Sequence, residues 1–93
     1  MSRADCYLVE CYWPGVSTDQ LADVAARTDR AAAAVRKRGR GFRFLGSILV
    51  PADETVFCLF NGSEADVRTV VEDAGVPFER ILESIRVDAD GYG

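Results

Sequence analysis

Residues 42–60 read FRFLGSILVPADETVFCLF, and this stretch decides the fold. It contains two apolar runs rich in β-branched and aromatic residues, which a short turn built on Pro51, Asp53 and Glu54 joins. This pattern predicts a β-hairpin. A helical pattern lies on each side of the hairpin, and a further strand pattern lies towards each end of the chain. The order β-α-β-β-α-β predicts a ferredoxin-like α+β fold, in which right-handed crossovers place two helices on one face of a four-stranded antiparallel sheet.

The boundaries of the elements follow from capping and turn residues. The expected strands are 6–13, 42–50, Thr55–Asn61 and 80–87. Gly46 inside the second strand indicates a β-bulge. Ser17 and Gln20 have the spacing of a capping box and begin the first helix, whereas Ser63 caps the second, which ends at Gly75. We expect one domain, residues 1–93, with residues 88–93 as a flexible tail.

Composition and charge narrow the classes of partner. The chain has 93 residues and a net charge of −4, and no apolar run approaches the roughly 20 residues that cross a bilayer. We therefore expect neither nucleic acid nor a membrane as partner. The first ten residues do not resemble a signal peptide, which predicts a cytoplasmic location. Cys6, Cys11 and Cys58 are too few for a disulfide framework, and the first two should leave opposite faces of one strand.

The predicted strands are apolar on both faces, although two helices can cover only one face. By residue number, the apolar strand residues fall into two parity sets, one of which we expect to face water. The odd set is Tyr7, Val9, Leu45, Leu49, Phe57 and Leu59, and the even set is Leu8, Phe42, Phe44, Ile48, Val56 and Phe60. The exposed apolar area of such a face exceeds the few hundred square ångströms of contiguous apolar surface that a monomer tolerates. The sequence therefore predicts a homodimer of the dimeric α/β-barrel type, packed sheet on sheet.

Three segments resemble a known bacterial family of unknown function. They are YLVECYWPG at residues 7–15, LGSILVPADETVFCLF at residues 45–60 and AGVPFERILES at residues 74–84. The turn P-x-D-E-T and the motif G-x-P-F-E-R are the more specific parts. The family's best-known member is a small nickel-binding protein with a dimeric ferredoxin-like fold, so the resemblance implies that fold, a dimer and nickel.

The nickel that the resemblance implies meets an obstacle in the composition. Imidazole is the usual side-chain ligand for nickel among nitrogen and oxygen donors, and this chain has no histidine. Its thiols and carboxylates do not fall in a metal-ligand spacing. We therefore expect no cofactor and regard nickel as disfavoured.

Two carboxylates in apolar strands are the main candidates for a ligand-binding site. Glu10 interrupts the first strand and Glu83 the last, and these strands are antiparallel neighbours in the predicted fold. If both faced the sheet–helix cleft, they could share a proton or hold a cation with Cys58. The alternative is that each reaches solvent or pairs with an arginine such as Arg43 or Arg80. Tyr7 and Arg43 complete the expected ligand-binding residues.

Two functions fit this pattern. The first is a homodimeric binding module that holds a small ligand or metal ion in a cleft beside the sheet. The second is a cofactor-independent enzyme similar to the dimeric α/β-barrel monooxygenases and isomerases. Cavity size separates them, because such an enzyme needs a pocket of about 300 Å³ or more with convergent polar groups.

Overall fold

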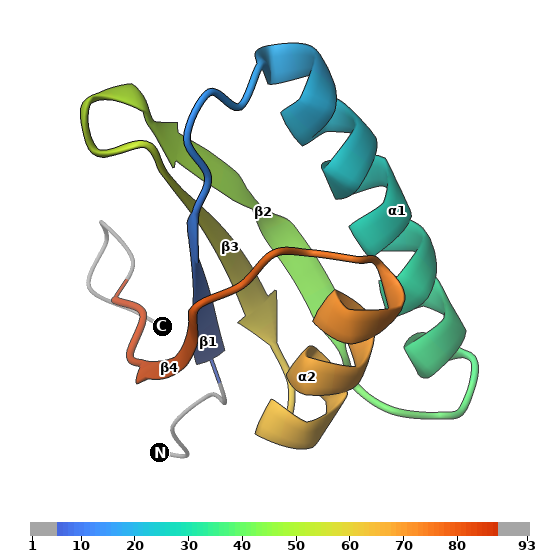
Figure 1. Cartoon of the computed structure of the whole chain (residues 1–93). Helices are drawn as coiled ribbons and strands as arrows, with labels where there is room; N and C mark the ends of the chain where they lie inside the picture. The colour runs from blue at the N-terminus through green and yellow to red at the C-terminus, as the bar shows by residue number, and fades with distance from the viewer. Residues whose placement is uncertain (1–5, 88–93) are drawn as a thin grey trace.

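The computed structural model describes residues 6–87 and has the predicted ferredoxin-like architecture (Figure 1). All strand pairs are antiparallel, and the order across the sheet is β2-β3-β1-β4. The strands are β1 (Cys6–Tyr12), β2 (Arg43–Val50), β3 (Thr55–Asn61) and β4 (Arg80–Ser84), and the helices are α1 (Thr18–Arg36), η1 (Pro51–Asp53) and α2 (Glu64–Asp73). The expected tail at 88–93 lies outside the described residues.

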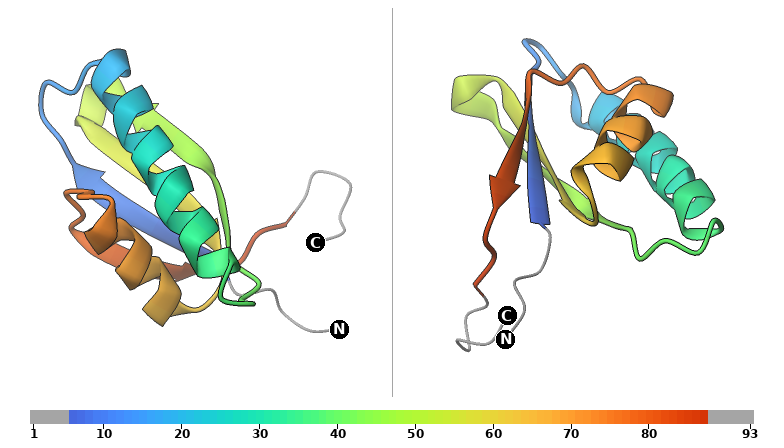
Figure 2. Two further views of the ribbon diagram at one scale, coloured as in Figure 1. Left: turned by 90° about the vertical axis from the view of Figure 1, so that its right-hand side faces the viewer. Right: turned by 90° about the horizontal axis from the view of Figure 1, so that it is seen from below.

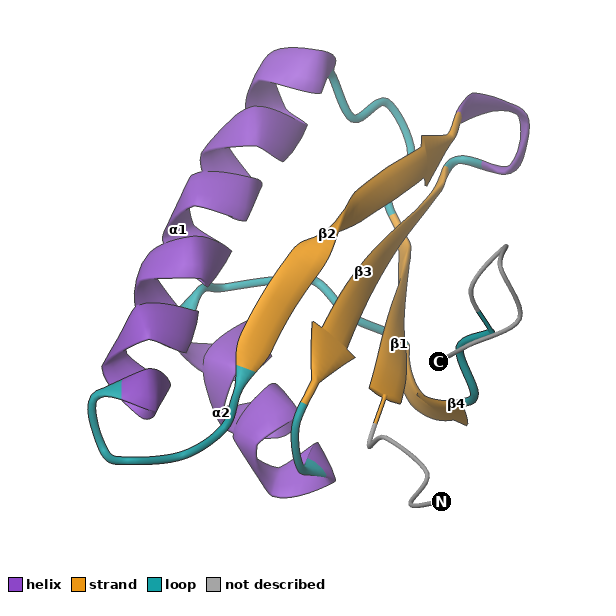
Figure 3. Cartoon of the chain, turned by 180° about the vertical axis from the view of Figure 1, so that it is seen from behind, coloured by secondary structure: helices purple, strands orange, loops and turns teal. Residues whose placement is uncertain are grey.

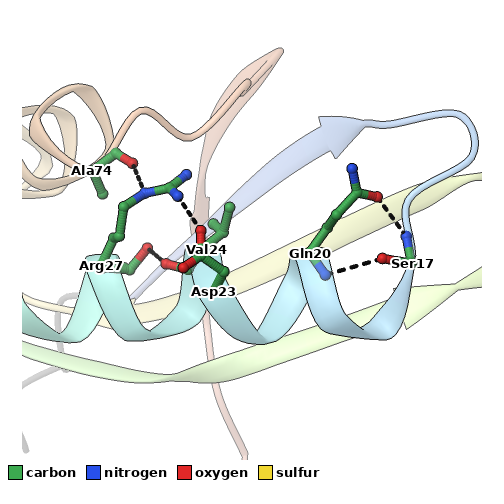
Figure 4. Close-up of polar contacts among 7 residues, drawn as sticks. Ser17, Gln20, Asp23, Val24, Arg27 and Ala74 are labelled. Carbon is green, nitrogen blue, oxygen red and sulfur yellow. Dashed lines mark hydrogen bonds and ion pairs between the residues drawn. The ribbon is translucent and has the colours of Figure 1, made fainter.

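Local signals fix both helix starts as predicted. The Ser17 hydroxyl accepts a hydrogen bond from the Gln20 backbone N–H, and the Gln20 side chain accepts one from the Ser17 N–H, which forms the capping box (Figure 4). Ser63 caps α2 by accepting from the Asp66 N–H. The Arg27 side chain donates a hydrogen bond to the Ala74 carbonyl at the end of α2, which ties the two helices together.

The two helices form one layer and the sheet forms the other (Figure 2). The buried stripe of α1 is Val24, Thr28, Ala32 and Val35, and that of α2 is Val67, Val70 and Val71. From the sheet, Val9, Val56 and Phe60 are at most 2% exposed and complete the core. The Phe60 ring packs against Phe42 and Phe44, with centroids 5.6 and 5.2 Å apart respectively.

The strand register assigns side chains to the two faces of the sheet and corrects the parity sets. Val9 pairs with Cys58 and Tyr7 with Phe60, so these four side chains face the helices. Leu8 pairs with Leu59 and Glu10 with Phe57, so these four belong to the other face. Each predicted set therefore contains residues from both faces, because pairing between strands, and not odd or even numbering, decides which residues share a face.

We call the face away from the helices the open face. It is turned towards the viewer in Figure 3. The paired residues that define it are Leu8, Glu10, Gly46, Ile48, Val50, Phe57, Leu59, Arg80 and Leu82.

The predicted bulge at Gly46 is confirmed, and the fourth strand is shorter than expected. The β2–β3 register shifts between Phe44 and Gly46, and Gly46 has φ +133°, which is unfavourable for other residues. β4 ends at Ser84, where the prediction extended it to 87. Ser84 pairs with Cys6, and residues 85–87 are not in a strand. Within residues 6–87, no helix is long and apolar enough to span a membrane.

Candidate functional site

Glu10 is a partly buried carboxylate on the open face, and its partner is an arginine. In the antiparallel pairing of β1 with β4, Arg80 lies directly opposite Glu10. The two side chains form an ion pair with a distance of 2.7 Å from Arg80 Nη2 to Glu10 Oε1, and Arg80 Nε donates to the same oxygen. This hydrogen bond raises the pKa of Arg80. The alternative prediction, that Glu10 pairs with an arginine, is therefore confirmed.

Glu83 lies on the opposite face of the sheet from Glu10. It pairs with Tyr7, which in turn pairs with Phe60 on the helix side. Glu83 is exposed near the end of the edge strand β4, and Tyr7 is half-buried beside it. On β4, Glu83 lies three residues after Arg80, the partner of Glu10, and an odd spacing along a strand places side chains on opposite faces. The hypothesis that Glu10 and Glu83 share a proton or a cation is therefore wrong.

Arg43 and Cys58 do not join these carboxylates. Arg43 is exposed at the start of the other edge strand, β2, opposite Asn61. Cys58 is 1% exposed in the core, on the helix side of β3. The five expected site residues are thus distributed over both faces and all four strands of the sheet, and a ligand contact for any one of them stays a prediction.

Cys58 instead belongs to a polar cluster inside the core. Its sulfur lies 3.4 Å from the hydroxyl of Ser47, its partner in β2, and it hydrogen-bonds with the thiol of Cys11 from β1. These hydrogen bonds favour the thiolate of Cys58 and lower its pKa to about 7, although burial opposes the shift. The hydrogen bond with Cys58 and burial raise the pKa of Cys11, and the negative charges of Glu79 and Glu10 raise it further by smaller amounts.

A small pocket lies where the β1–α1 loop meets the β2–β3 hairpin. It encloses about 180 Å³ and is lined by Trp13, Gly15, Val16, Leu49, Pro51 and Glu54. The Trp13 backbone N–H donates to the Glu54 carbonyl at 2.7 Å, which fixes the two walls relative to each other. Glu54 has a left-handed backbone with φ 51° at the end of η1, and its side chain is exposed.

None of the pocket's residues is among the ligand-binding residues predicted from the sequence. The signal that could have found them was present. The turn at Pro14 and Gly15 follows one strand, and the turn at Pro51 precedes its neighbour in the sheet. In antiparallel β1 and β3, the end of one strand lies beside the start of the other, so these two turns had to meet.

Comparison with known proteins agrees with this architecture. The family model described as "Nickel responsive protein SCO4226-like" matches residues 7–83. The chain belongs to the SCO4226-like family. The resemblance seen in the three sequence segments is therefore confirmed.

The crystal structure of SCO4226 from Streptomyces coelicolor A3(2) superposes with a TM-score of 0.68 at 27% sequence identity, over 89% of this chain and 99% of that one. No curated protein matches the chain significantly. The matched residues 7–83 include Cys11, Cys58 and the residues that line the pocket at Trp13.

Proposed function

We propose that this protein is a homodimeric binding module, in which two open faces pack together and each subunit holds a small ligand beside the sheet. The observation that carries the dimer is the apolar open face. Leu8, Phe57, Leu59 and Leu82 form its centre and are only partly buried, and Ile48 at the β2 edge is 62% exposed. Both helices cover the other side of the sheet.

The size of this face suits a stable association. A standard interface buries about 800 Å² on each partner. The subunit has 5918 Å² of accessible surface, so such an interface would remove roughly one seventh of it. Leucine and phenylalanine at the centre, with the Glu10–Arg80 pair on the same face, give the apolar core and polar groups that are typical of dimer contacts.

The pocket at Trp13 supports ligand binding over catalysis. Its volume of about 180 Å³ is below the roughly 300 Å³ expected of an enzyme pocket, so this pocket does not suit the active site of a cofactor-independent monooxygenase or isomerase. Trp13 and Leu49 offer apolar walls, and Glu54 offers a carboxylate. This lining favours a small ligand with an apolar body and a cationic group, such as an amine, because aromatic faces and carboxylates both attract cations.

The donor atoms of this chain do not fit the metal that the family's description names. The chain has no histidine. Within the described part, residues 6–87, no three histidine, cysteine, aspartate or glutamate side chains come together as a metal site. We therefore assign no nickel centre to this chain, and its binding role rests on the Trp13 pocket.

Native mass spectrometry of the protein purified from its own host tests this function. We expect about twice the 10.2 kDa chain mass, with retained ligand in the wild type. Trp13→Ala and Glu54→Gln should remain dimeric and lose the ligand, whereas the control Glu64→Gln, an exposed carboxylate on α2, should keep it. A monomer at micromolar concentration would refute the dimer. Ligand retention in both pocket variants, or submicromolar Ni²⁺ binding by calorimetry, would contradict the proposed site.

A further inference from the structure

Two of the three cysteines are neighbours on the helix side of the sheet. Val9 pairs with Cys58 and Cys11 pairs with Val56, so Cys58 lies diagonally across from Cys11 on adjacent strands. Both side chains are 1% exposed, and their thiols interact directly as free thiols. Cys6 is also buried, but its pairing with Asn61 and Ser84 places it on the open face, so it cannot join them.

The surroundings of the pair favour a neutral product over a charged one. Val9 and Val56 are the cross-strand partners of the two cysteines, and both valines are at most 2% exposed. The charged groups that act on Cys11 are the carboxylates of Glu79 and Glu10, which oppose any further negative charge. A disulfide carries no charge, so its formation adds no buried anion at this site.

The polar contacts give the two sulfurs different roles. Cys58 shares one hydrogen bond with the Ser47 hydroxyl and another with the Cys11 thiol, and both lower the pKa of Cys58, so thiolate character concentrates there. Cys11 keeps its proton and interacts with the Cys58 sulfur. A thiol of lowered pKa beside a second, protonated thiol is one feature of cysteines that oxidise reversibly, although here both thiols are buried.

We propose that Cys11 and Cys58 form a reversible intrachain disulfide when a hydroperoxide oxidises the protein. The Cys58 thiolate attacks one peroxide oxygen, the O–O bond breaks, and the leaving oxygen takes a proton as water or alcohol, which leaves a sulfenic acid on Cys58. The Cys11 sulfur then attacks the Cys58 sulfur, the S–O bond breaks, and the hydroxyl leaves as water with the Cys11 proton. Two thiols and one hydroperoxide thus give one disulfide, one water and one further water or alcohol.

The Trp13 pocket shares a row of the sheet with Cys11. Leu49, in the pocket lining, pairs with Val56, and Val56 pairs with Cys11. Both sulfurs are buried, so a small hydroperoxide reaches them through a local opening of the structure at this row.

The diagonal geometry also makes the disulfide easy to reduce. Diagonal residues on antiparallel strands have Cα atoms about 7–8 Å apart, whereas a relaxed disulfide holds them at about 4.4–6.8 Å. Closing the bond must draw β1 and β3 together, and strained disulfides have more oxidising potentials. We therefore expect glutathione to reduce it, as suits a regulatory bond.

The test treats the reduced full-length protein with excess hydrogen peroxide at neutral pH, alkylates the remaining thiols and measures intact mass and peptides. We expect each chain to lose two hydrogens and keep one alkylatable thiol, Cys6. Proteolysis after Glu10 separates Cys6 from Cys11, and the Cys11 peptide should be linked to the Cys58 peptide. Reduced glutathione should restore three thiols.

Three variants assign the roles. Cys6→Ala is the matched control and should form the same bond. In Cys11→Ala, a 1,3-diketone reagent should trap sulfenic acid on Cys58, and Cys58→Ala should give neither a disulfide nor an adduct on Cys11. Three alkylatable thiols in the wild type after peroxide, a disulfide through Cys6, or a link only between chains would overturn the proposal. The wild-type peptide map decides even if a variant fails to fold.

Discussion

The open face makes a quantitative prediction at Ile48. This side chain is 62% exposed on the edge strand β2, directly opposite Phe57. Burying a whole isoleucine contributes about 1.5–3 kcal/mol, so covering the exposed part in a dimer contributes about 1–2 kcal/mol per subunit. A twofold dimer contains the residue twice. Ile48→Glu should therefore lose about 2–4 kcal/mol of association energy, and an unpaired buried carboxylate adds to the loss.

This loss corresponds to a rise in the dimer dissociation constant of about 1.5 to 3 orders of magnitude. Sedimentation velocity over a dilution series measures it directly. Ala26→Glu introduces the same charge on the exposed side of α1 and serves as the control, which should sediment like the wild type. Circular dichroism should show that both variants are folded, because each replaced side chain is exposed. An Ile48→Glu protein that dimerises as tightly as the control would refute a sheet-on-sheet interface.

Three further predictions concern the core and its thiols. Phe60→Ala removes a ring that is fully buried between two others and should lower the free energy of unfolding by about 3–5 kcal/mol in urea titration. Gly62→Ala should cost more than about 1 kcal/mol, because φ is +146° there and the new Cβ would lie 3.1 Å from Cε1 of Phe42 and closer still to Cδ1. At Gly41 an added Cβ would have no neighbour within 4 Å, so Gly41→Ala should change the free energy of unfolding little. Equal losses of stability at the two glycines would contradict the steric argument. Alkylation of Cys58, followed by peptide mapping, should accelerate with rising pH and level off above about pH 7. A rate that still rises about three- to sixfold between pH 8 and pH 9 would show an ordinary thiol.

The fold could be predicted because its signals are local. The hairpin at residues 51–54, the caps at Ser17 and Ser63, and the strand Thr55–Asn61 each depend on neighbours in the sequence, and each is confirmed. The assignment of strand residues to faces failed because it depends on register, which couples residues far apart in the chain. Numbering alone could not place Val9 beside Cys58.

The site residues were harder to predict for the same reason. Glu10 and Glu83 were correctly placed on neighbouring strands, yet the register puts Glu10 opposite Arg80, three residues from Glu83, and this odd spacing places the two carboxylates on opposite faces of the sheet. Cys58 was correctly placed in a strand, but its contact with Cys11 depends on a diagonal between strands that only the three-dimensional pairing defines. Glu54 joined the pocket through a turn conformation and not through a motif.

The bulge at Gly46 gives the second strand a place where its length can change without a change of faces. Phe44 pairs with Phe60 and Gly46 with Leu59, which leaves Leu45 as the extra residue. Phe44 and Ser47 therefore both face the helices although one number is even and the other odd. Deleting Leu45 would restore a regular ladder in which Phe44 and Ser47 keep their partners and their faces. A one-residue gap here in an aligned relative therefore predicts the same partner for Cys58, as does a gap in the exposed turn at residues 51–54.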